Sequence, residues 1–287
     1  MNISIEIFMS FFKSIELFFL KLPLQHPFQT SFGVQYDNES ILTKLTTSNG
    51  QVGWGEIPLT FDPGYCYETV STARHILADF IIPGLKSANT NPEFRESSIN
   101  DWTSLYQTIV KDIRGHEFTK AGLEFSLWNL RSEIEGKHLS KLLGATKEKI
   151  PVGISIGIQE NKDKIVKDIQ NALENKYKRI KIKIGPENDI EIIKHIRKEL
   201  GDFPLMVDAN SAYTLEDVDH LKKLDKFDLL MIEQPLAYND IVDHAILQKN
   251  METPVCLDES IHSVDDVRKA FSDNIFLYFD CFLYTCL

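Results

Sequence analysis

Three acidic residues recur at a constant spacing, each in a segment with the composition of a short buried strand. Asp208 lies in PLMVDAN, Glu233 in LLMIEQP and Asp258 in PVCLDES, so successive acids are 25 residues apart. A strand and a helix together take about that many residues, so we expect the acids at the ends of neighbouring parallel strands. Carboxylate oxygens are the ligands that Mg²⁺ prefers. One such acid would more often be a helix cap or a salt-bridge partner, but three favour a site for Mg²⁺ or another divalent cation such as Mn²⁺.

Two lysines precede the acids by one further interval. In RIKIK (179–183), apolar and charged residues alternate, so Lys181 and Lys183 share one face of a strand. A lysine that lies near a metal and a second cation loses proton affinity and can act as a base near neutral pH. Lysines can also decorate an edge strand to prevent aggregation. The acids that follow favour the catalytic interpretation.

Two polar residues are weaker candidates for binding a substrate. Ser155 lies in the first strand of the alternating region, at a position that could face a cavity. Asn210 follows Asp208 by two residues and could orient a ligand or a metal-bound water. For both residues, a local hydrogen bond to the backbone explains the residue type equally well.

The elements that must position these residues alternate regularly from about residue 150. The predicted strands are 152–158, 179–184, 204–209, 229–234 and 254–259, and the predicted helices are near 161–175, 188–200, 215–224, 240–250 and 263–271. Apolar strands that alternate with amphipathic helices predict a parallel sheet. A repeat of about 25 residues favours a closed barrel over a doubly wound sheet, with the functional side chains at the carboxyl ends of the strands.

The N-terminal part has a different pattern. A strand is predicted at 14–24, and two more at 40–59 around a Ser-Asn-Gly turn. Helical periodicity follows at 66–83, 92–110 and 120–137, where Gly136 suits a helix C-cap. We therefore predict an α+β domain over residues 1–130, with 1–13 as a possible extension, and an α/β domain over 131–287.

Composition excludes several classes of function. The 287 residues carry a net charge of −11, which argues against nucleic-acid binding but leaves room for a small anionic substrate beside local cations. The Phe-rich N-terminus is interrupted by Glu6, Lys13 and Glu16, so we predict neither a signal peptide nor a membrane span. The four cysteines form no CxxC pair, which favours a reducing cytoplasm.

Taken together, the motifs resemble the enolase superfamily, in its muconate-lactonising-enzyme-like branch. The likeness covers about residues 14–271 and is strongest to the o-succinylbenzoate synthases and their relatives with N-acylamino acid racemase activity. It rests on LPLQHPFQTSFG (22–33), GWGE (53–56), AGLEFSLWNL (121–130), RIKIKIGP (179–186), MVDANSAYTL (206–215), MIEQPL (231–236) and TPVCLDESI (253–261). The resemblance implies an N-terminal α+β capping domain and a TIM-type (β/α) barrel.

The resemblance also implies a chemistry. Asp208, Glu233 and Asp258 would hold Mg²⁺, Lys183 would be the general base and acid, and Lys181 would support it electrostatically. In the synthases, removal of the proton α to a carboxylate gives an enediolate that loses water, a step of menaquinone biosynthesis. An N-acylamino acid racemase or dipeptide epimerase shares these motifs and is the alternative. Either would act on a small carboxylate, and such enzymes are often homo-oligomers.

The C-terminal end departs from the family pattern. The family carries a second lysine at the end of the sixth barrel strand, whereas no lysine follows Lys269 in this chain. Residues 272–287 do not resemble the family, and the five predicted β/α units are fewer than the eight of a closed barrel. We therefore predict an incomplete barrel whose lyase activity is impaired by truncation. A catalytically dead fragment is the alternative of another class.

Overall fold

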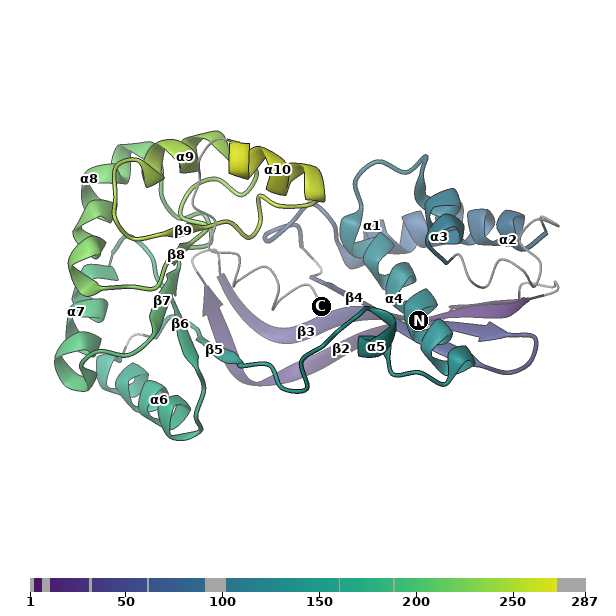
Figure 1. Cartoon of the computed structure of the whole chain (residues 1–287), viewed down its shortest axis with the longest axis horizontal. Coiled ribbons are helices and arrows are strands. Elements are labelled where there is room, and N and C mark those ends of the chain that lie inside the picture. The colour runs from purple at the N-terminus through teal and green to yellow at the C-terminus, as the bar shows by residue number, and fades with distance from the viewer. Residues whose placement is uncertain are drawn as a thin grey trace. The chain divides into compact units, whose positions relative to one another are not determined.

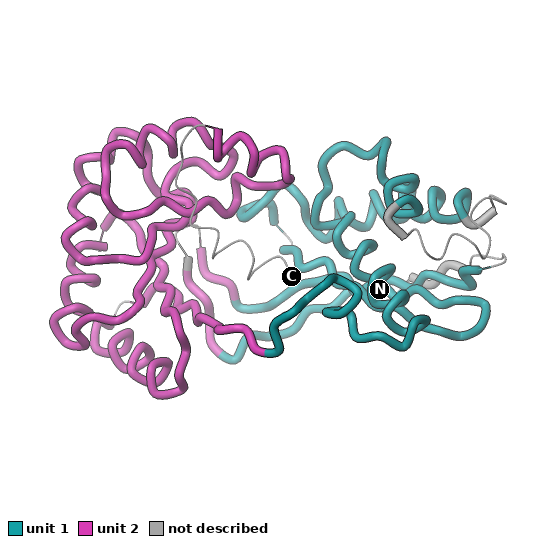
Figure 2. The backbone as a smooth tube through the Cα atoms, in the orientation of Figure 1, with its two compact units in different colours: residues 1–25, 36–148 teal, residues 26–35, 149–287 magenta. Residues whose placement is uncertain are grey.

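The computed structural model describes residues 3–6, 11–30, 33–60, 62–90, 102–159, 161–187 and 189–272. The chain forms two compact units (Figure 2). Unit 1 comprises residues 1–25 and 36–148, and unit 2 comprises residues 26–35 and 149–287. The predicted boundary after residue 130 falls inside a helix, whereas the units divide after Glu148. The unusual tail predicted at 272–287 lies, from residue 273 on, outside the described residues.

Most of an antiparallel sheet with the strand order β1-β2-β3-β4 lies in unit 1, while the ends of β2 and β3 within residues 26–35 belong to unit 2. The strands are β1 (Ile3–Glu6), β2 (Phe12–Thr30), β3 (Gly33–Thr47) and β4 (Val52–Leu59), and the long β2 and β3 run side by side in Figure 1. The strands predicted at 14–24 and 40–59 are confirmed. The possible extension before residue 14 contains β1, in which Ile3 pairs with Leu17.

Among the described helices of unit 1, the longest packs on strand β4 of this sheet. The described helices are α1 (Val70–Ile76), the π-helical turn η1 (Leu77–Ile81), α2 (Ile82–Thr90), α3 (Trp102–Val110), α4 (Glu117–Glu135) and α5 (Leu139–Leu142). The helix predicted at 120–137 is therefore confirmed as α4, which ends at Gly136 with φ 59°. The first part of the helix predicted at 92–110 lies outside the described residues, and α3 follows it. Leu123, Leu127 and Leu130 of α4 are buried in the core of unit 1.

Unit 2 contains a parallel sheet with the strand order β5-β6-β7-β8-β9. The strands are β5 (Gly153–Ile156), β6 (Arg179–Lys183), β7 (Leu205–Asp208), β8 (Ile232–Glu233) and β9 (Val255–Cys256). The helices are α6 (Lys162–Glu174), α7 (Asp189–Leu200), η4 (Leu215–Asp217), α8 (Val218–Leu221), η5 (Lys222–Phe227), α9 (Val242–Gln248) and α10 (Val264–Ser272). All five predicted strands and all five predicted helices are confirmed, as expected for an α/β unit of the TIM-barrel type.

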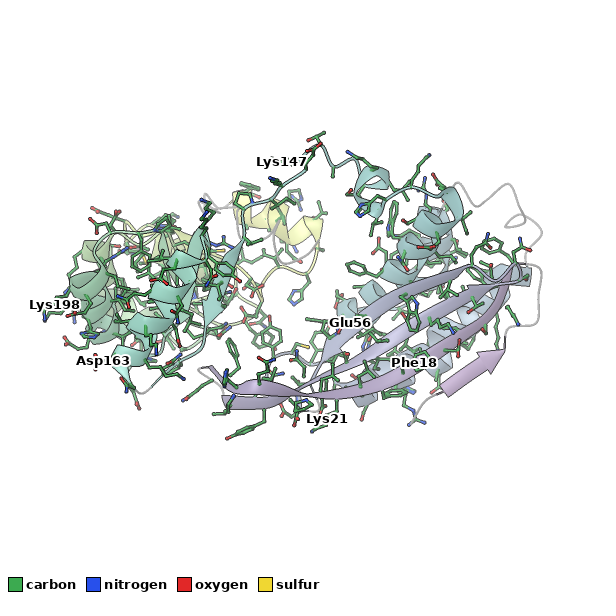
Figure 3. The ribbon with its side chains drawn as sticks, turned by 90° about the horizontal axis from the view of Figure 1, so that it is seen from below. Phe18, Lys21, Glu56, Lys147, Asp163 and Lys198 are labelled. Atoms are coloured by element: carbon green, nitrogen blue, oxygen red, sulfur yellow. The ribbon has the colours of Figure 1, made fainter. Side chains whose placement is uncertain are left out.

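The two faces of the parallel sheet differ. One face packs on the helices through aliphatic residues such as Ile180, Ile182 and Val207, all fully buried. Outward-facing side chains of these helices, such as Asp163 and Lys198 in Figure 3, lie at the surface. The other face carries a small buried cluster of Met206, Met231 and Cys256. Cys256, which is 2% exposed, is therefore a core residue.

None of the helices in the described ranges is long and apolar enough to cross a membrane. The cytoplasmic location that the cysteine pattern favours stays a prediction.

Candidate active site

The predicted acids gather at one end of the parallel sheet in unit 2. Asp208 and Glu233 are the last residues of β7 and β8 and are direct register partners. Glu233 also pairs with Cys256, so Asp258 lies two residues beyond the last pair that joins β8 and β9. Asp208 and Glu233 are buried, and Asp258 is largely buried. The equal spacing therefore places two acids side by side and the third just past a strand end.

The two lysines reach the same acids from β6. Lys181 Nζ lies 2.8 Å from Glu233 Oε1 and 3.0 Å from Asp208 Oδ2. Lys183 Nζ lies 2.5 Å from Asp208 Oδ2 and 2.7 Å from Asn210 Oδ1. Lys183 is buried, with 9% of its surface exposed. One carboxylate oxygen thus accepts from both ammonium groups, which fixes the lysines beside each other.

The charges of these groups are set by opposing effects. Burial disfavours the charged form of Lys181, but the carboxylates of Asp208 and Glu233 outweigh it and raise the pKa of this lysine. Burial would likewise raise the pKa of Asp208, but Lys181 and Lys183 outweigh it and lower that pKa. Lys181 and Asp208 are therefore a fixed cation and a fixed anion near neutral pH.

The negative charges of Glu233 and Asp258 are only partly compensated by the lysines. Burial, followed by repulsion from Asp208, raises the pKa of Glu233 to about 7. Burial, followed by repulsion from Glu259, raises the pKa of Asp258 to about 6. Both carboxylates therefore hold excess negative charge once they ionise. A bound cation would reduce the electrostatic repulsion between these carboxylates.

Glu259 is a fourth acid of the cluster that the sequence analysis did not identify. Asn210 Nδ2 donates to Glu259 Oε1 over 2.9 Å, while Glu259 Oε2 is buried and has no hydrogen-bond partner among the described residues. Burial, followed by repulsion from Asp208, raises the pKa of Glu259. The only signal in the sequence was its position next to Asp258 in LDES.

The predicted substrate-binding residues differ in their placement. Asn210 lies inside the cluster, where its backbone N–H donates to Asp208 Oδ1 over 3.1 Å. Ser155 of β5 is the register partner of Lys181. It also lines a cavity of about 900 Å³ beside α6 and residues 26–28, and none of the lysines and acids of the cluster lines that cavity. Asn210 is thus in contact with the predicted base, whereas the substrate role of Ser155 rests on its strand position alone.

Among the described residues, no group of three or more acidic, His or Cys side chains is already arranged to hold a metal ion. The ammonium group of Lys181 instead lies between Asp208 and Glu233. The donor set nevertheless fits Mg²⁺. Four carboxylates (Asp208, Glu233, Asp258, Glu259) face two ammonium groups (Lys181, Lys183), which leaves two excess negative charges when all are ionised. Oxygen ligands and a double negative charge suit a hard divalent cation.

Comparison with known proteins agrees with this fold. Residues 14–144 match the N-terminal domain of the mandelate racemase / muconate lactonizing enzyme family, and residues 164–280 match the enolase C-terminal domain-like family. A solved structure of an enolase superfamily member from Listeria innocua superposes with a TM-score of 0.81 at 38% identity, over 92% of this chain and 68% of that one. The chain therefore belongs to the mandelate racemase / muconate lactonizing enzyme family of the enolase superfamily, which confirms the resemblance.

Two relatives show which activities occur among similar sequences. The chain is 45% identical to the o-succinylbenzoate synthase of Geobacillus stearothermophilus over 88% of its length, and it spans 64% of that enzyme. It is 38% identical to the N-succinylamino acid racemase of Thermus thermophilus over 90% of its length, and it spans 67% of that enzyme. Similar sequences thus include both a lyase and a racemase.

Proposed function

We propose that this chain carries the site of a Mg²⁺-dependent lyase of the o-succinylbenzoate synthase type. The observation that carries the proposal is the contact of Lys183 with Asp208 and Asn210, beside the register pair of Asp208 and Glu233. A buried amine next to a group of oxygen ligands suits removal of a proton from a carboxylate substrate. The identity of 45% to a synthase favours this reaction among those that begin in that way.

The residues have distinct roles in the proposed reaction. Asp208, Glu233 and Asp258 would hold the cation, which when bound supplies positive charge for the carboxylate oxygens of the substrate. Once Lys183 has released a proton to solvent, its neutral Nζ accepts the proton α to that carboxylate, and the C–H electron pair passes into an enediolate. Lys183 then returns a proton to the departing hydroxyl group, the C–O bond breaks, water leaves and the ring becomes aromatic. Lys183 therefore ends the cycle neutral.

Two further groups would support Lys183. Lys181, which contacts Asp208 and Glu233 in the metal-free chain, would supply a positive charge next to the base. Asn210 Oδ1 accepts from Lys183 Nζ over 2.7 Å, which restricts the direction in which the amine points. The contact with Asn210 keeps the amine of Lys183 in place. A direct contact of Asn210 or Ser155 with the substrate remains part of the proposal.

The direct test is conversion of succinyl-hydroxycyclohexadiene carboxylate by the 287-residue chain, followed by absorbance with and without Mg²⁺. We expect slow, Mg²⁺-dependent conversion that falls by about 10³-fold in Lys183→Ala. Lys178→Ala removes an exposed lysine just before the same strand and should leave the rate unchanged. A chain that binds Mg²⁺ but gives no Lys183-dependent conversion would contradict the lyase and support the catalytically dead fragment.

Racemisation or epimerisation of an N-acylamino acid is the second candidate, favoured by the 38% identity to the Thermus thermophilus racemase. The two reactions share proton removal by Lys183 but differ in the step that follows. Incubation of N-succinylamino acids in D₂O separates them, because a racemase yields deuterated product of inverted configuration. Inversion faster than dehydration would replace the lyase with the racemase. The predicted homo-oligomer stays a prediction.

A further inference from the structure

A buried glutamine, Gln234, joins the ends of the two shortest strands in the described part of unit 2. It follows Glu233 directly, is 0% exposed and has a φ of 37°. A non-glycine residue in the left-handed region is strained and persists only where its surroundings determine it. Its contacts explain why this conformation is kept.

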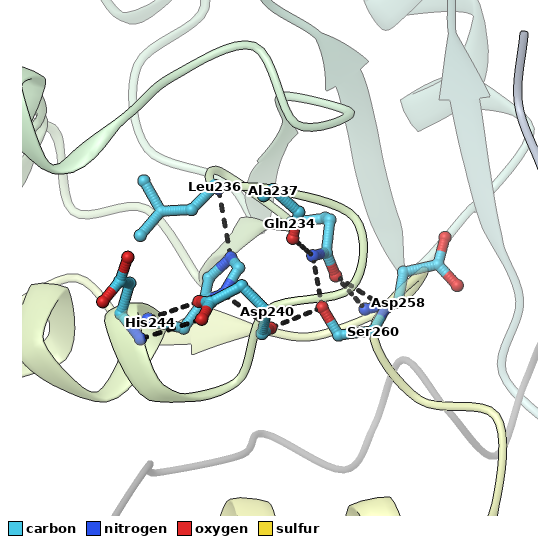
Figure 4. A network of polar contacts seen from close by, with 8 residues as sticks. Gln234, Leu236, Ala237, Asp240, His244, Asp258 and Ser260 are labelled. Atoms are coloured by element: carbon cyan, nitrogen blue, oxygen red, sulfur yellow. Dashed lines mark hydrogen bonds and ion pairs between the residues drawn. The ribbon is translucent and has the colours of Figure 1, made fainter.

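Both ends of the Gln234 amide are used (Figure 4). Oε1 accepts from the backbone N–H groups of Asp258 at 2.9 Å and Ser260 at 3.3 Å. Nε2 donates to the Ser260 hydroxyl at 2.6 Å and the Ala237 carbonyl at 3.0 Å. Two accepted and two donated bonds exhaust the capacity of a primary amide in this geometry. Gln234, which follows β8, therefore holds the segment that follows β9 in place.

A second set of bonds anchors this clamp to α9. Ser260 Oγ donates to the Asp240 carbonyl over 2.6 Å. His244 Nε2 accepts from the Leu236 N–H over 3.0 Å, so the other ring nitrogen carries the proton and donates to Asp240 Oδ2 over 2.8 Å. Burial lowers the pKa of His244, which favours the neutral ring that these bonds require. The amide is thus part of a rigid network.

The sheet itself does not fix Asp258. The ladder between β8 and β9 ends at the pair of Glu233 and Cys256, two residues before Asp258. The described side-chain contact that bridges this gap is the bond from the Asp258 N–H to Gln234 Oε1. Glu233 and Gln234 are consecutive. Glu233 supplies one acid of the cluster, and Gln234 holds the backbone of a second acid, Asp258, in a fixed position relative to it.

We propose that Gln234 is a positioning residue that sets the place of Asp258 relative to Glu233 and thereby pre-organises the carboxylates for a divalent cation. The inference rests on the proposed function for the identity of the cation. Gln234 itself does not touch the cation or the substrate in this role. It acts only through the backbone of Asp258 and Ser260.

The chain offers a matched control, Gln248, which clamps the other end of β9 by the same chemistry. Its Oε1 accepts from the Val255 N–H over 2.7 Å, and its Nε2 donates to the carbonyls of Met251 and Thr253 over 3.2 and 3.3 Å. Loss of either glutamine amide leaves buried backbone groups without partners and should cost similar stability. Only Gln234 lies beside the acids.

The experiment is calorimetric titration of the metal-free 287-residue chain with Mg²⁺, for the wild type, Gln234→Leu and Gln248→Leu, with melting temperatures recorded in parallel. We expect both variants to melt at similarly lowered temperatures. The dissociation constant for Mg²⁺ should rise at least about tenfold in Gln234→Leu, as is usual when a group that orients a metal ligand is lost, and stay within about twofold of wild type in Gln248→Leu.

Other results would contradict either the positioning role of Gln234 or the proposed function. Wild-type affinity in Gln234→Leu, or an equal loss in Gln248→Leu, would overturn the positioning role alone. Absence of Mg²⁺ binding by the wild-type chain would overturn the proposed function and the inference with it. Should Gln234→Leu not fold, Ser260→Ala removes one partner of the amide and leaves the backbone bonds in place. A threefold weaker affinity then supports the role, and an unchanged affinity overturns it.

Discussion

Glu68 in unit 1 and Glu259 in unit 2 are both removed from solvent, but their carboxylates are bonded very differently. Glu68 accepts from the backbone N–H groups of Phe118 at 2.9 Å and Thr119 at 3.0 Å, and from the Thr119 hydroxyl at 2.6 Å. These groups belong to the first turn of α4, so Glu68 completes the start of that helix. Glu259 has one bonded oxygen, and its other oxygen is buried with no hydrogen-bond partner in the described part of the chain.

The same contrast extends to the interiors of the two units. In unit 1 the backbones of β4 and α4 approach so closely that a Cβ on Gly55 would lie 2.0 Å from the Gly122 carbonyl oxygen. In unit 2 the carboxyl ends of the strands surround four carboxylates and two lysines. Buried polar groups that are fully bonded serve folding, whereas crowded and partly bonded ones are placed for a ligand.

The largest effect should follow from loss of Asp208, because its carboxylate contacts both lysines of the cluster in unit 2. Asp208→Ala leaves the ammonium groups of Lys181 and Lys183 without the carboxylate oxygen that accepts from both. Removal of one partner of a buried ion pair typically costs about 3–5 kcal/mol. We expect urea denaturation to show that loss for unit 2, together with loss of Mg²⁺ binding. Asp219→Asn changes an exposed acid on α8 and should alter neither.

Gly55→Ala tests whether unit 1 depends on close packing alone. The added methyl group would overlap the Gly122 carbonyl, so we expect a loss of about 2–3 kcal/mol in the free energy of unfolding, with unchanged Mg²⁺ affinity. Gly84→Ala is the matched control, because its Cβ would meet no atom closer than 3.4 Å and α2 has room for it. Equal effects of the two substitutions would show that steric overlap is not the cause.

The two glutamates give the sharpest version of the comparison. Glu68→Gln turns an amide N–H toward backbone and hydroxyl donors, so we expect a loss of about 2 kcal/mol in stability. Glu259→Gln removes one charge from an acidic cluster and should leave the metal-free chain unchanged or slightly more stable, while weakening Mg²⁺ binding. Thermal unfolding with and without Mg²⁺ measures both. Destabilisation of the same size in both variants would remove the distinction between them.

The smallest expected effect concerns pH. The pKa of Glu233 is raised from 4.5 to about 7 and that of Asp258 from 3.8 to about 6, mainly by burial. At pH values between the ordinary and the raised pKa of each group, the folded state binds more protons than the unfolded state. These two groups therefore lower stability as pH rises from about 4 to about 7. Mg²⁺ binds the deprotonated groups and should raise the melting temperature more at about pH 8 than at about pH 5.

That measurement compares samples with and without Mg²⁺ at the same pH, because His244 contributes the opposite trend. Its pKa is lowered by burial, so its contribution to stability increases as pH rises. Subtraction of the metal-free melting temperature cancels this contribution. A Mg²⁺-induced rise that is equal at both pH values would contradict the raised pKa values of Glu233 and Asp258.

Sequence periodicity was sufficient for the elements of unit 2 because each strand and helix has its own apolar pattern. The interval of 25 residues also places Asp208 and Glu233 together, since both end their strands. It does not indicate that Asp258 lies two residues beyond the end of its strand, because β9 is only two residues long. Strand length depends on pairing partners, which a local pattern does not contain.

Residues that act through tertiary contacts were missed for a related reason. Gln234 was not identified because its role depends on a left-handed backbone and on bonds to residues 24 and 26 positions later. Glu259 was overlooked because a second acid next to a metal ligand also suits a surface position. Gly55 and Gly122 lie in the motifs GWGE and AGLEFSLWNL, but the close approach of β4 and α4 has no periodicity that would predict it.

The ammonium group of Lys181 has a consequence for how the protein would mature. Because this cation lies between Asp208 and Glu233, the chain carries its own counter-ion and does not need to acquire a metal before unit 2 can fold. Folding and metal uptake are then separate events. The free Mg²⁺ concentration would then set the fraction of chains that bind Mg²⁺, and not the fraction that fold.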